Sequence, residues 1–473
     1  MKKKEVVNGQ VKVGKIRKIG STSDSLTARG GLFFYNEYVK NTKILSRLSH
    51  KFSHIKKSTK GLSVENYFKQ LISFFMDGTK LDLTYFDELK EDTSYSELLN
   101  LEQSAMASSH QIKRMTGKFT NSKRHKEVFR DILSDIFVQM LIAKQPKVVE
   151  IGLDTMVLDN DDSKLKEKCS PTYKGVKGFQ PLQAYWNGMI IDAIFRDGKC
   201  HSNHSDHVKK MIKKLVKKIR KGYRKDVPII LTMDSGFLSD ENFTYFDEVL
   251  KIKYICVGKM YSSIKDYIGE LPVNNRKVFS GKHEWEYIEF GNKLKSWKKF
   301  RRAVYVQQVT NDIDQMVLDF ARSDRVIYTN IGLDSETDKA LYLQDDKDYF
   351  SAEFIIEQHH KRATDELINR ELKNFMTKEK LPFRAFSSNR VFYFMEVISF
   401  ALMRSFQNEI LLDDKLKNIR PDTFRRVFID IAGKVVSHAG QKILKLKESI
   451  FEKLNLKTVF ERIKTLNYAM AYF

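Results

Sequence analysis

The pattern of apolar and polar residues predicts a mostly helical N-terminal part over residues 26–140. In VENYFKQLISFFMDG (64–78) and KEVFRDILSDIFVQMLIAK (126–144), apolar residues recur at the spacing of an amphipathic helix. The first helix is predicted to end at Gly78 and the second before Pro146. Between them, residues 108–126 form a polar, basic segment around one short predicted helix.

After Pro146 the period changes to that of strands. KVVEIGLDTMVL (147–158) alternates, so that Glu150, Gly152 and Asp154 share one face of a predicted strand. Two further strand-like runs, 178–187 and 188–198, meet at an Asn-Gly turn.

The alternation of strands and helices then continues towards residue 260. Four elements follow in chain order: a basic amphipathic helix over 208–223, a buried strand that ends at Asp234, a helix over 241–251 and a strand over 253–259. This order predicts a mixed α/β layer arrangement.

Residues 260–325 interrupt this rhythm with short runs that alternate or are rich in aromatic residues, Lys and Arg. The runs are HEWEYIEF (283–290), KLKSWKKF (293–300) and RRAVYVQQV (301–309), and they predict a small β-rich insertion. RVIYTNI then predicts another sheet strand, a charged helix covers 358–373, and a long helical tail is predicted up to residue 473.

The charge balance narrows the class of partner. Lys and Arg number 83 against 60 Asp and Glu, a net charge of +23, which favours nucleic acid and, less often, an anionic membrane. Three scattered cysteines without a CxxC pair argue against a disulfide framework and against a cysteine zinc site, and they fit a reducing cytoplasm. No apolar run of about 18 residues is present, so no membrane span is expected.

Three acidic residues are candidates for chemistry. Asp154 lies near the end of the first predicted strand, and Asp234 ends the VPIILTMD strand before a Ser-Gly turn. Strand ends are where open α/β folds place their sites, although either residue alone is equally compatible with capping a turn. With Glu366 of the charged helix they form a set of hard oxygen ligands suited to Mg²⁺.

The charged helix carries a stripe that is open to two interpretations. At about 3.6 residues per turn, one arc holds a set of charged side chains spaced by three or four residues: Arg362, Glu366, Arg370 and Lys373, with His359 before them. A solvated face would gain only about 0.2–0.5 kcal/mol from the Arg362–Glu366 pair. A working face would turn Glu366 to metal, and Arg362 and Lys373 to substrate phosphates.

On these residues the chain resembles the DDE transposases of bacterial insertion sequences, in the large "insertion sequence four" superfamily. Their third-acid helix carries Tyr, two residues, Arg, three residues, Glu, six residues and Lys. His359, Arg362, Glu366 and Lys373 stand at these spacings, with His359 in place of the tyrosine. LDTMVLDND and LTMDSGF resemble the two aspartate blocks, and the resemblance covers roughly residues 145–405.

The resemblance implies an α/β fold with an RNase H-like catalytic core, a mixed sheet flanked by helices. The implied regions are a basic arm and helical DNA-binding region (1–140), the core in two parts (141–259 and 326–400) around the β-rich insertion (260–325), and a helical C-terminal region (401–473). Asp154, Asp234 and Glu366 are then the catalytic residues and hold two Mg²⁺ ions, or Mn²⁺, for cleavage and strand transfer in cut-and-paste transposition.

The implied partners are double-stranded DNA, as terminal inverted repeats and target, and a second copy of the chain in the DNA complex, in a bacterial cytoplasm and without a membrane. Expected DNA contacts are Arg362, Lys373, His359 and, in the basic segment of a helix-turn-helix-like reader, Arg114. Trp285 or Trp297 is a candidate to stack on a flipped base, although either residue is also suited to the core of the insertion.

Two other functions remain open at this stage. The same core suits a metal-dependent nuclease without strand transfer, and the basic surface suits an inactive, transposase-derived DNA-binding protein. The segment CHSNHSDH offers His201, His204 and His207 at steps of three, which is compatible with helix capping or, less well, with zinc.

Overall fold

The computed structural model describes residues 6–7, 10–11, 16, 18–58, 60–163, 165–280, 284–309, 324–333, 335–344, 348–375 and 379–466. Residues 1–5, 8–9, 12–15 and 17 of the expected basic arm lie outside these ranges. Within them, no helix is long and apolar enough to cross a membrane.

The N-terminal part is helical, as predicted. Its elements are β1 (Val6–Val7), β2 (Gln10–Val11), β3 (Ser25–Thr27), α1 (Gly31–Asn41), α2 (Ile44–Lys51), α3 (Val64–Asp77), α4 (Tyr85–Glu91), α5 (Thr93–Leu98), α6 (Ser109–Thr116) and α7 (Lys123–Lys144). Helix α3 ends where Gly78 adopts the left-handed conformation (φ 63°), which glycine reaches without steric cost. Both predicted helix ends, at Gly78 and before Pro146, are confirmed.

The α/β part follows the predicted order of elements. They are β4 (Val149–Thr155), β5 (Leu158–Asp159), β6 (Ser170–Pro171), β7 (Lys177–Phe179), β8 (Leu182–Trp186), β9 (Met189–Ile194), α8 (His207–Gly222), β10 (Ile229–Met233), α9 (Asp240–Thr244) with a π-helical turn (Tyr245–Val249), and β11 (Lys253–Val257). Asn187 and Gly188 both have positive φ in the β8–β9 turn, as an Asn-Gly hairpin requires.

The third part returns to the sheet and then to helices. Its elements are α10 (Ser262–Glu270), β12 (Lys277–Ser280), β13 (Glu284–Asn292), β14 (Arg301–Gln308), β15 (Arg325–Thr329), α11 (Ser335–Tyr342), α12 (Ala352–Lys361), α13 (Ala363–Phe375), α14 (Phe386–Glu409), α15 (Pro421–Phe424), β16 (Gly433–His438), β17 (Gln441–Leu446), α16 (Glu448–Lys453) and α17 (Leu456–Thr465).

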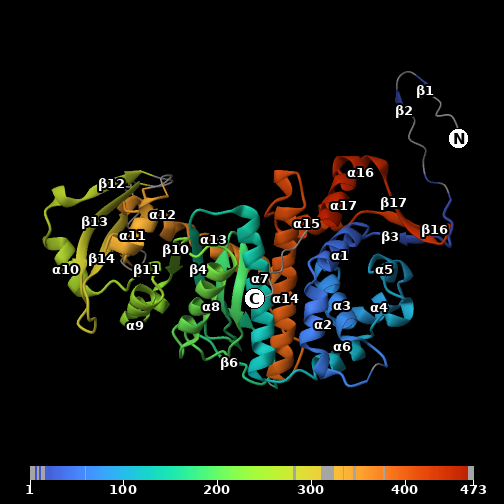
Figure 1. Cartoon of the computed structure of the whole chain (residues 1–473), viewed down its shortest axis with the longest axis horizontal. Coiled ribbons are helices and arrows are strands. Elements are labelled where there is room, and N and C mark those ends of the chain that lie inside the picture. Colours follow the sequence, from blue (N-terminus) through green and yellow to red (C-terminus); the bar gives the residue numbers. More distant parts are fainter. Residues whose placement is uncertain are drawn as a thin grey trace.

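One nine-stranded mixed sheet organises the α/β part, with strand order β12-β13-β14-β15-β11-β10-β4-β8-β9. Strands β4, β10 and β11 are parallel neighbours, whereas the other pairings in the sheet are antiparallel. The mixed α/β fold is therefore confirmed. The strands expected in an insertion, β12 to β14, continue the same sheet through β15 (Figure 1).

Helices cover both faces of this sheet. Helices α7, α8 and α14 contact β9 on one face, and α12 contacts β11, β14 and β15 on the other. In Figure 1, α7 and α14 stand between the sheet and the N-terminal helices.

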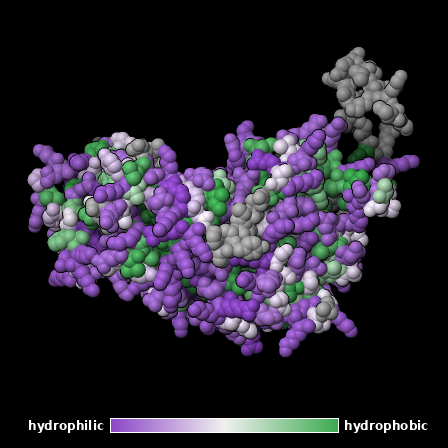
Figure 2. Space-filling model, in the orientation of Figure 1, coloured by the Kyte–Doolittle hydropathy of each residue, from purple (hydrophilic) through white to green (hydrophobic). Residues whose placement is uncertain are grey.

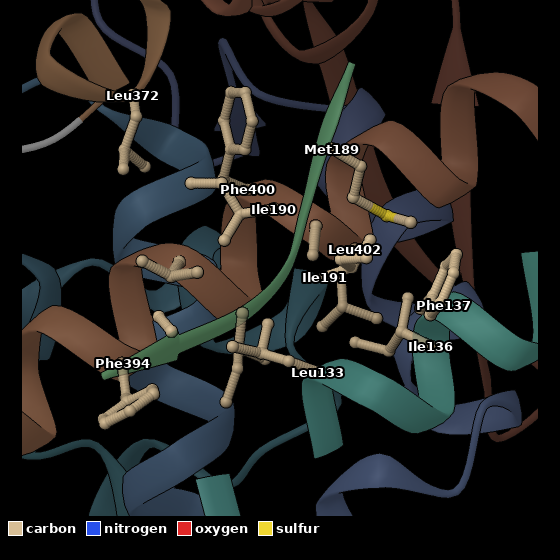
Figure 3. Close-up of a cluster of buried hydrophobic side chains, with 14 of the residues drawn as sticks. Leu133, Ile136, Phe137, Met189, Ile190, Ile191, Leu372, Phe394, Phe400 and Leu402 are labelled. Atoms are coloured by element: carbon tan, nitrogen blue, oxygen red, sulfur yellow. The ribbon is translucent and has the colours of Figure 1, made fainter. Parts of the chain in front are cut away.

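Apolar side chains from α7, β9 and α14 interdigitate in the core (Figure 3). Leu133, Ile190 and Leu402 are among the fully buried residues there, and burying one such side chain contributes about 1.5–3 kcal/mol. The outer surface is mostly hydrophilic on the face that Figure 2 shows.

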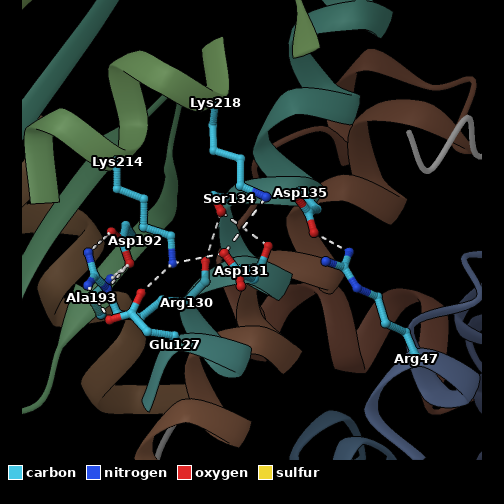
Figure 4. A network of polar contacts seen from close by, with 10 residues as sticks. All are labelled: Arg47, Glu127, Arg130, Asp131, Ser134, Asp135, Asp192, Ala193, Lys214 and Lys218. Atoms are coloured by element: carbon cyan, nitrogen blue, oxygen red, sulfur yellow. Dashed lines mark hydrogen bonds and ion pairs between the residues drawn. The ribbon is translucent and has the colours of Figure 1, made fainter. Parts of the chain in front are cut away.

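Some lysines on the basic face of α8 form ion pairs with acidic residues of α7. Lys214 lies 3.0 Å from Asp131, and Lys218 lies 2.7 Å from Asp135. Arg47 of α2 reaches Asp135 from the other side (Figure 4). These lysines therefore hold α8 against α7, while Lys213 and Lys217 remain exposed.

Two expectations about individual elements are wrong. KLKSWKKF is a loop between β13 and β14, because its tryptophan turns into the core against Phe243 and Tyr328 instead of alternating along a strand. The tail is not helical throughout, since 433–446 forms the β16–β17 hairpin, which pairs with β3. That pairing partner lies about 400 residues away in sequence, so local periodicity does not reveal it.

Candidate active site

Two aspartates lie side by side at the carboxyl ends of neighbouring parallel strands. Leu153 of β4 pairs in register with Met233 of β10, so the next residues, Asp154 and Asp234, reach the same edge of the sheet. Asp234 accepts a hydrogen bond from the backbone N–H of Gly236 at 2.8 Å, which fixes the turn after β10.

Arg362 bridges these two carboxylates. Its Nη2 lies 3.7 Å from Asp154 Oδ1 and 3.6 Å from Asp234 Oδ2. The side chains are only 13% exposed for Asp154 and 30% for Asp234, against 16% for Arg362. The two acids thus already converge on one cationic group at a partly enclosed position.

Glu366 lies in the first turn of α13, exposed to solvent and within electrostatic reach of the pair. Burial raises the pKa of the Asp154 carboxyl to about 6. Arg362 and a backbone hydrogen bond from Thr155 lower it, while Asp234 and Glu366 raise it further. The negative charges of Asp234 and Glu366 therefore act on Asp154 in addition to its burial.

A hydrogen-bonded chain behind Asp154 orients its carboxylate. The Asn369 amide donates to Asp154 Oδ2 at 3.2 Å, and the Tyr185 hydroxyl donates to Asn369 Oδ1 at 2.6 Å. Asn369 comes from the second turn of α13, so this helix contributes both Glu366 and an anchor for Asp154.

The charged segment 358–373 is not the single helix that the sequence predicted. Helix α12 ends at Lys361 and α13 begins at Ala363. At the junction the backbone N–H groups of Arg362 and Asp365 bond three residues back instead of four. This tighter turn breaks the predicted arc, so His359 and Glu366 belong to different helices.

His359 faces inwards at the end of α12. Its ring is 4% exposed, and its Nε2 accepts a hydrogen bond from Arg325 at 2.9 Å. Burial, together with Arg325, His360 and Arg362, lowers the pKa of His359 to about 3, which keeps the imidazole neutral. The neutral imidazole therefore holds the side chain of Arg325 through this hydrogen bond.

The remaining candidate DNA contacts differ in exposure. Lys373 pairs with Glu379 at 2.9 Å, and Arg114 is exposed on α6. Trp285 is half-buried on β13, where its ring lies 4.4 Å from that of His360. Trp297 is only 5% exposed and packs within the core, so its ring offers no free face to a base.

Two residues near the acids were not among the candidate site residues predicted from the sequence. Asp365 packs so closely against β4 that a Cβ on Gly152 would lie 1.9 Å from its Oδ2. Burial, then the charge of Asp154, raises the pKa of Asp365 to about 7. Gly152, on the same strand face as Asp154, is the sequence feature that indicates this contact. A glycine within a strand often marks a place where another segment packs closely against the backbone.

The second missed residue is Tyr173, on the connection between β6 and β7. Its side chain is 69% exposed, and its pKa is raised by partial desolvation and then by Asp154, Asp234 and Glu366. Its hydroxyl therefore lies in the electrostatic field of the acids. Nothing in the local pattern distinguishes this tyrosine from an ordinary loop residue.

The donor set fits a divalent cation without presenting a closed cage. Among the described residues, no group of three or more His, Cys, Asp and Glu is arranged to hold a metal ion. Yet Asp154 and Asp234 converge on a single cation, Arg362, and their oxygens are the hard ligands that Mg²⁺ prefers. A divalent ion at this position would replace the guanidinium between them.

Comparison with known proteins gives one match over nearly the whole chain. The family model described as "Transposase DDE domain group 1" matches residues 11–468. Seven chains of solved structures also match. One is a piggyBac transposase synaptic complex with hairpin DNA, 12% identical, with a TM-score of 0.40 over 95% of this chain and 86% of that chain. No curated protein matches the sequence.

Proposed function

Since the chain belongs to the DDE transposase family, we propose that it is the DNA transposase of a bacterial insertion sequence, of the "insertion sequence four" superfamily. It binds the terminal inverted repeats of its element as a homodimer in the bacterial cytoplasm. It then cuts the ends and joins them to target DNA.

The observation that carries this proposal is the convergence of Asp154 and Asp234 on one cation at the carboxyl ends of paired parallel strands, with Glu366 close enough to perturb Asp154. We assign these three residues as the catalytic acids. The three parallel strands β4, β10 and β11, of which the first two lead into the aspartates, are flanked by α7, α8 and α12 and support an RNase H-like core.

Asp154, Asp234 and Glu366 would hold two Mg²⁺ ions, or Mn²⁺ in their place. When bound, such ions lower the pKa of water to generate a nucleophile and stabilise the leaving oxygen of a phosphodiester. The chain's own contribution is to orient the carboxylates. Asn369 holds Asp154 through its amide, and the Gly236 N–H holds Asp234.

Arg362 has two acceptors in this function. It neutralises Asp154 and Asp234 in the free protein, and with metal bound it pairs with a phosphate of the substrate, where a guanidinium fits bidentately. Lys373 lies on α13, the helix of Glu366, and provides a second phosphate contact once it leaves Glu379. His359 acts through Arg325, and Trp285 is the aromatic available for a flipped base.

The test is an incubation of the full chain with duplexes that carry the inverted repeats flanking its gene, in Mg²⁺ or Mn²⁺. Nicks, hairpins and joined products are scored. Asp154→Asn, Asp234→Asn and Glu366→Gln should each abolish cleavage and leave end binding intact. Asp162→Asn, at an exposed acid that pairs with Lys380, is the matched control and should cut normally.

The outcomes separate the alternatives. Normal cutting by any of the three variants would remove that residue from the site. Cleavage without joined product would make the protein a metal-dependent nuclease. Binding without cleavage by the wild type would make it an inactive, transposase-derived DNA-binding protein.

A further inference from the structure

A cavity of about 450 Å³ lies on the sheet face that α7, α8 and α14 cover. The end of β9 and the first turns of these three helices line it. None of its lining residues belongs to the acid cluster. Seven Lys and Arg side chains line it against two carboxylates, Glu127 and Asp197. Glu127 is already engaged by Arg130 and Lys214, so little negative charge is left to balance the cavity.

Arg390 forms part of the cavity wall and is buried, with no counter-ion among the residues that the structure describes. It is 1% exposed. Its guanidinium donates to the Asn121 side chain at 2.7 Å and to the Thr120 carbonyl at 2.5 Å, which are both neutral acceptors. Its Nε has no hydrogen-bond partner within the described part of the chain. Burying a charge without an opposite charge beside it costs several kcal/mol. This is about the cost of removing one partner of a buried ion pair.

Arg196 is a second buried arginine, 2% exposed, whose hydrogen bonds also go to neutral oxygens. One of them reaches the hydroxyl of Thr155 at 3.1 Å, the residue after Asp154 on β4. The cavity and the candidate active site are therefore tied to the same strand end, one on each side of the sheet. The third arginine, Arg130, differs because Asp192 neutralises it at 2.5 Å.

Lysines surround these arginines at the solvent side. Lys126, Lys168, Lys199 and Lys210 are exposed lining residues. Burial, then the positive charges of Arg390 and Lys168, lowers the pKa of Lys126, which shows that the cations act on one another. The cavity thus combines buried arginines in its wall with exposed lysines at its mouth.

We propose that this cavity binds a backbone phosphate of the DNA strand on which the acid site acts. The inference rests on the proposed function, because it identifies the ligand as the substrate of that site. The unbalanced arginines specify an anion, and phosphate, like carboxylate, is an anion that arginine binds bidentately. A mouth of several lysines suits a chain of successive charges, and Thr155, which Arg196 binds, directly follows Asp154 in the chain.

The test is equilibrium binding of a fluorescent 40-base-pair duplex to the full chain, in EDTA, across a series of salt concentrations. The variant Lys199→Gln/Lys210→Gln removes two charges at the mouth. The control Lys213→Gln/Lys217→Gln removes two exposed charges from α8, the helix of Lys210, at positions away from the cavity. Both variants have the same net charge, so any non-specific attraction is matched.

The mouth variant should bind more weakly, and its slope of log K against log salt should fall in magnitude by up to about 1.8, at about 0.9 per lost phosphate contact. The control should keep the wild-type slope. Arg390→Gln should reproduce the weaker binding, with its folding checked by thermal unfolding.

Equal slopes for the mouth variant and its control would overturn the proposal. A second arm adds inorganic phosphate at constant ionic strength. Thermal stabilisation of the wild type that is lost in the mouth variant, without a change in duplex affinity, would assign the cavity to free phosphate and also overturn it. Because EDTA excludes cleavage, failure of the cavity and failure of the catalytic assignment give separate results.

Discussion

Replacing Asp154 by asparagine should abolish cleavage and, at the same time, stabilise the free protein. Asp154 is 13% exposed and stands beside Asp234 and Glu366. Its folded-state pKa is raised from 3.8 to about 6, even with Arg362 nearby. The charge of ionised Asp154 therefore lowers the stability of the fold. Asparagine has nearly the same shape without this charge.

The size of the effect follows from the pKa shift. At about 1.4 kcal/mol per pKa unit, a shift of about two units costs about 3 kcal/mol when the group is ionised. Because the folded state binds the proton more tightly than the unfolded state, stability falls as pH rises from about 4 to about 6, and it stays lower above that range. The asparagine variant should thus gain about 3 kcal/mol at pH 8 and about half of that at pH 5.

The assay is urea unfolding of the full chain in EDTA, at pH 5 and pH 8, for the wild type and Asp154→Asn. Asp192→Asn is the opposite control. Asp192 is fully buried and paired with Arg130, so its loss should destabilise the fold by about 3–5 kcal/mol. Equal or lower stability of Asp154→Asn at pH 8, or a gain that does not grow from pH 5 to pH 8, would refute the reasoning.

Three further predictions test the neighbourhood of the acids. Gly152→Ala should destabilise the fold by about 1–3 kcal/mol and slow cleavage, because its Cβ would lie 1.9 Å from Asp365. Adding Asp365→Ala should restore both stability and cleavage rate, as measured in unfolding and cleavage assays. Arg362→Gln should slow cleavage by about 100-fold yet tighten Mn²⁺ binding measured by titration, because Arg362 competes for both aspartates; unchanged Mn²⁺ affinity would contradict that competition. Trp297→Ala should cost about 3–5 kcal/mol of stability, whereas Trp285→Ala should mainly weaken binding of element ends in an anisotropy assay.

Much of the sheet and the positions of the two aspartates could be predicted from the sequence. The alternation around Gly152 marks the two faces of β4, whose burial alternates from residue to residue. Asp154 and Asp234 could be placed at strand ends because a strand's length follows from its apolar run, and parallel neighbours bring such ends to one edge.

The junction at Arg362 could not be predicted, because the helical spacing of charged residues continues across it without a Gly or Pro. Just after the break, Asp365 packs against Gly152, a contact between segments more than 200 residues apart. The ion pairs between Lys214 and α7 could not be predicted either, because an exposed lysine and a paired lysine occupy the same polar positions of the helical sequence pattern. Long-range contacts decide both cases.

The most direct test of the central claim is the anomalous diffraction of Mn²⁺ in crystals of the full chain with a duplex carrying its element end. The account predicts manganese peaks ligated by Asp154, Asp234 and Glu366, with Arg362 moved from the aspartates to a DNA phosphate. Manganese bound elsewhere, with Arg362 still between Asp154 and Asp234, would contradict it.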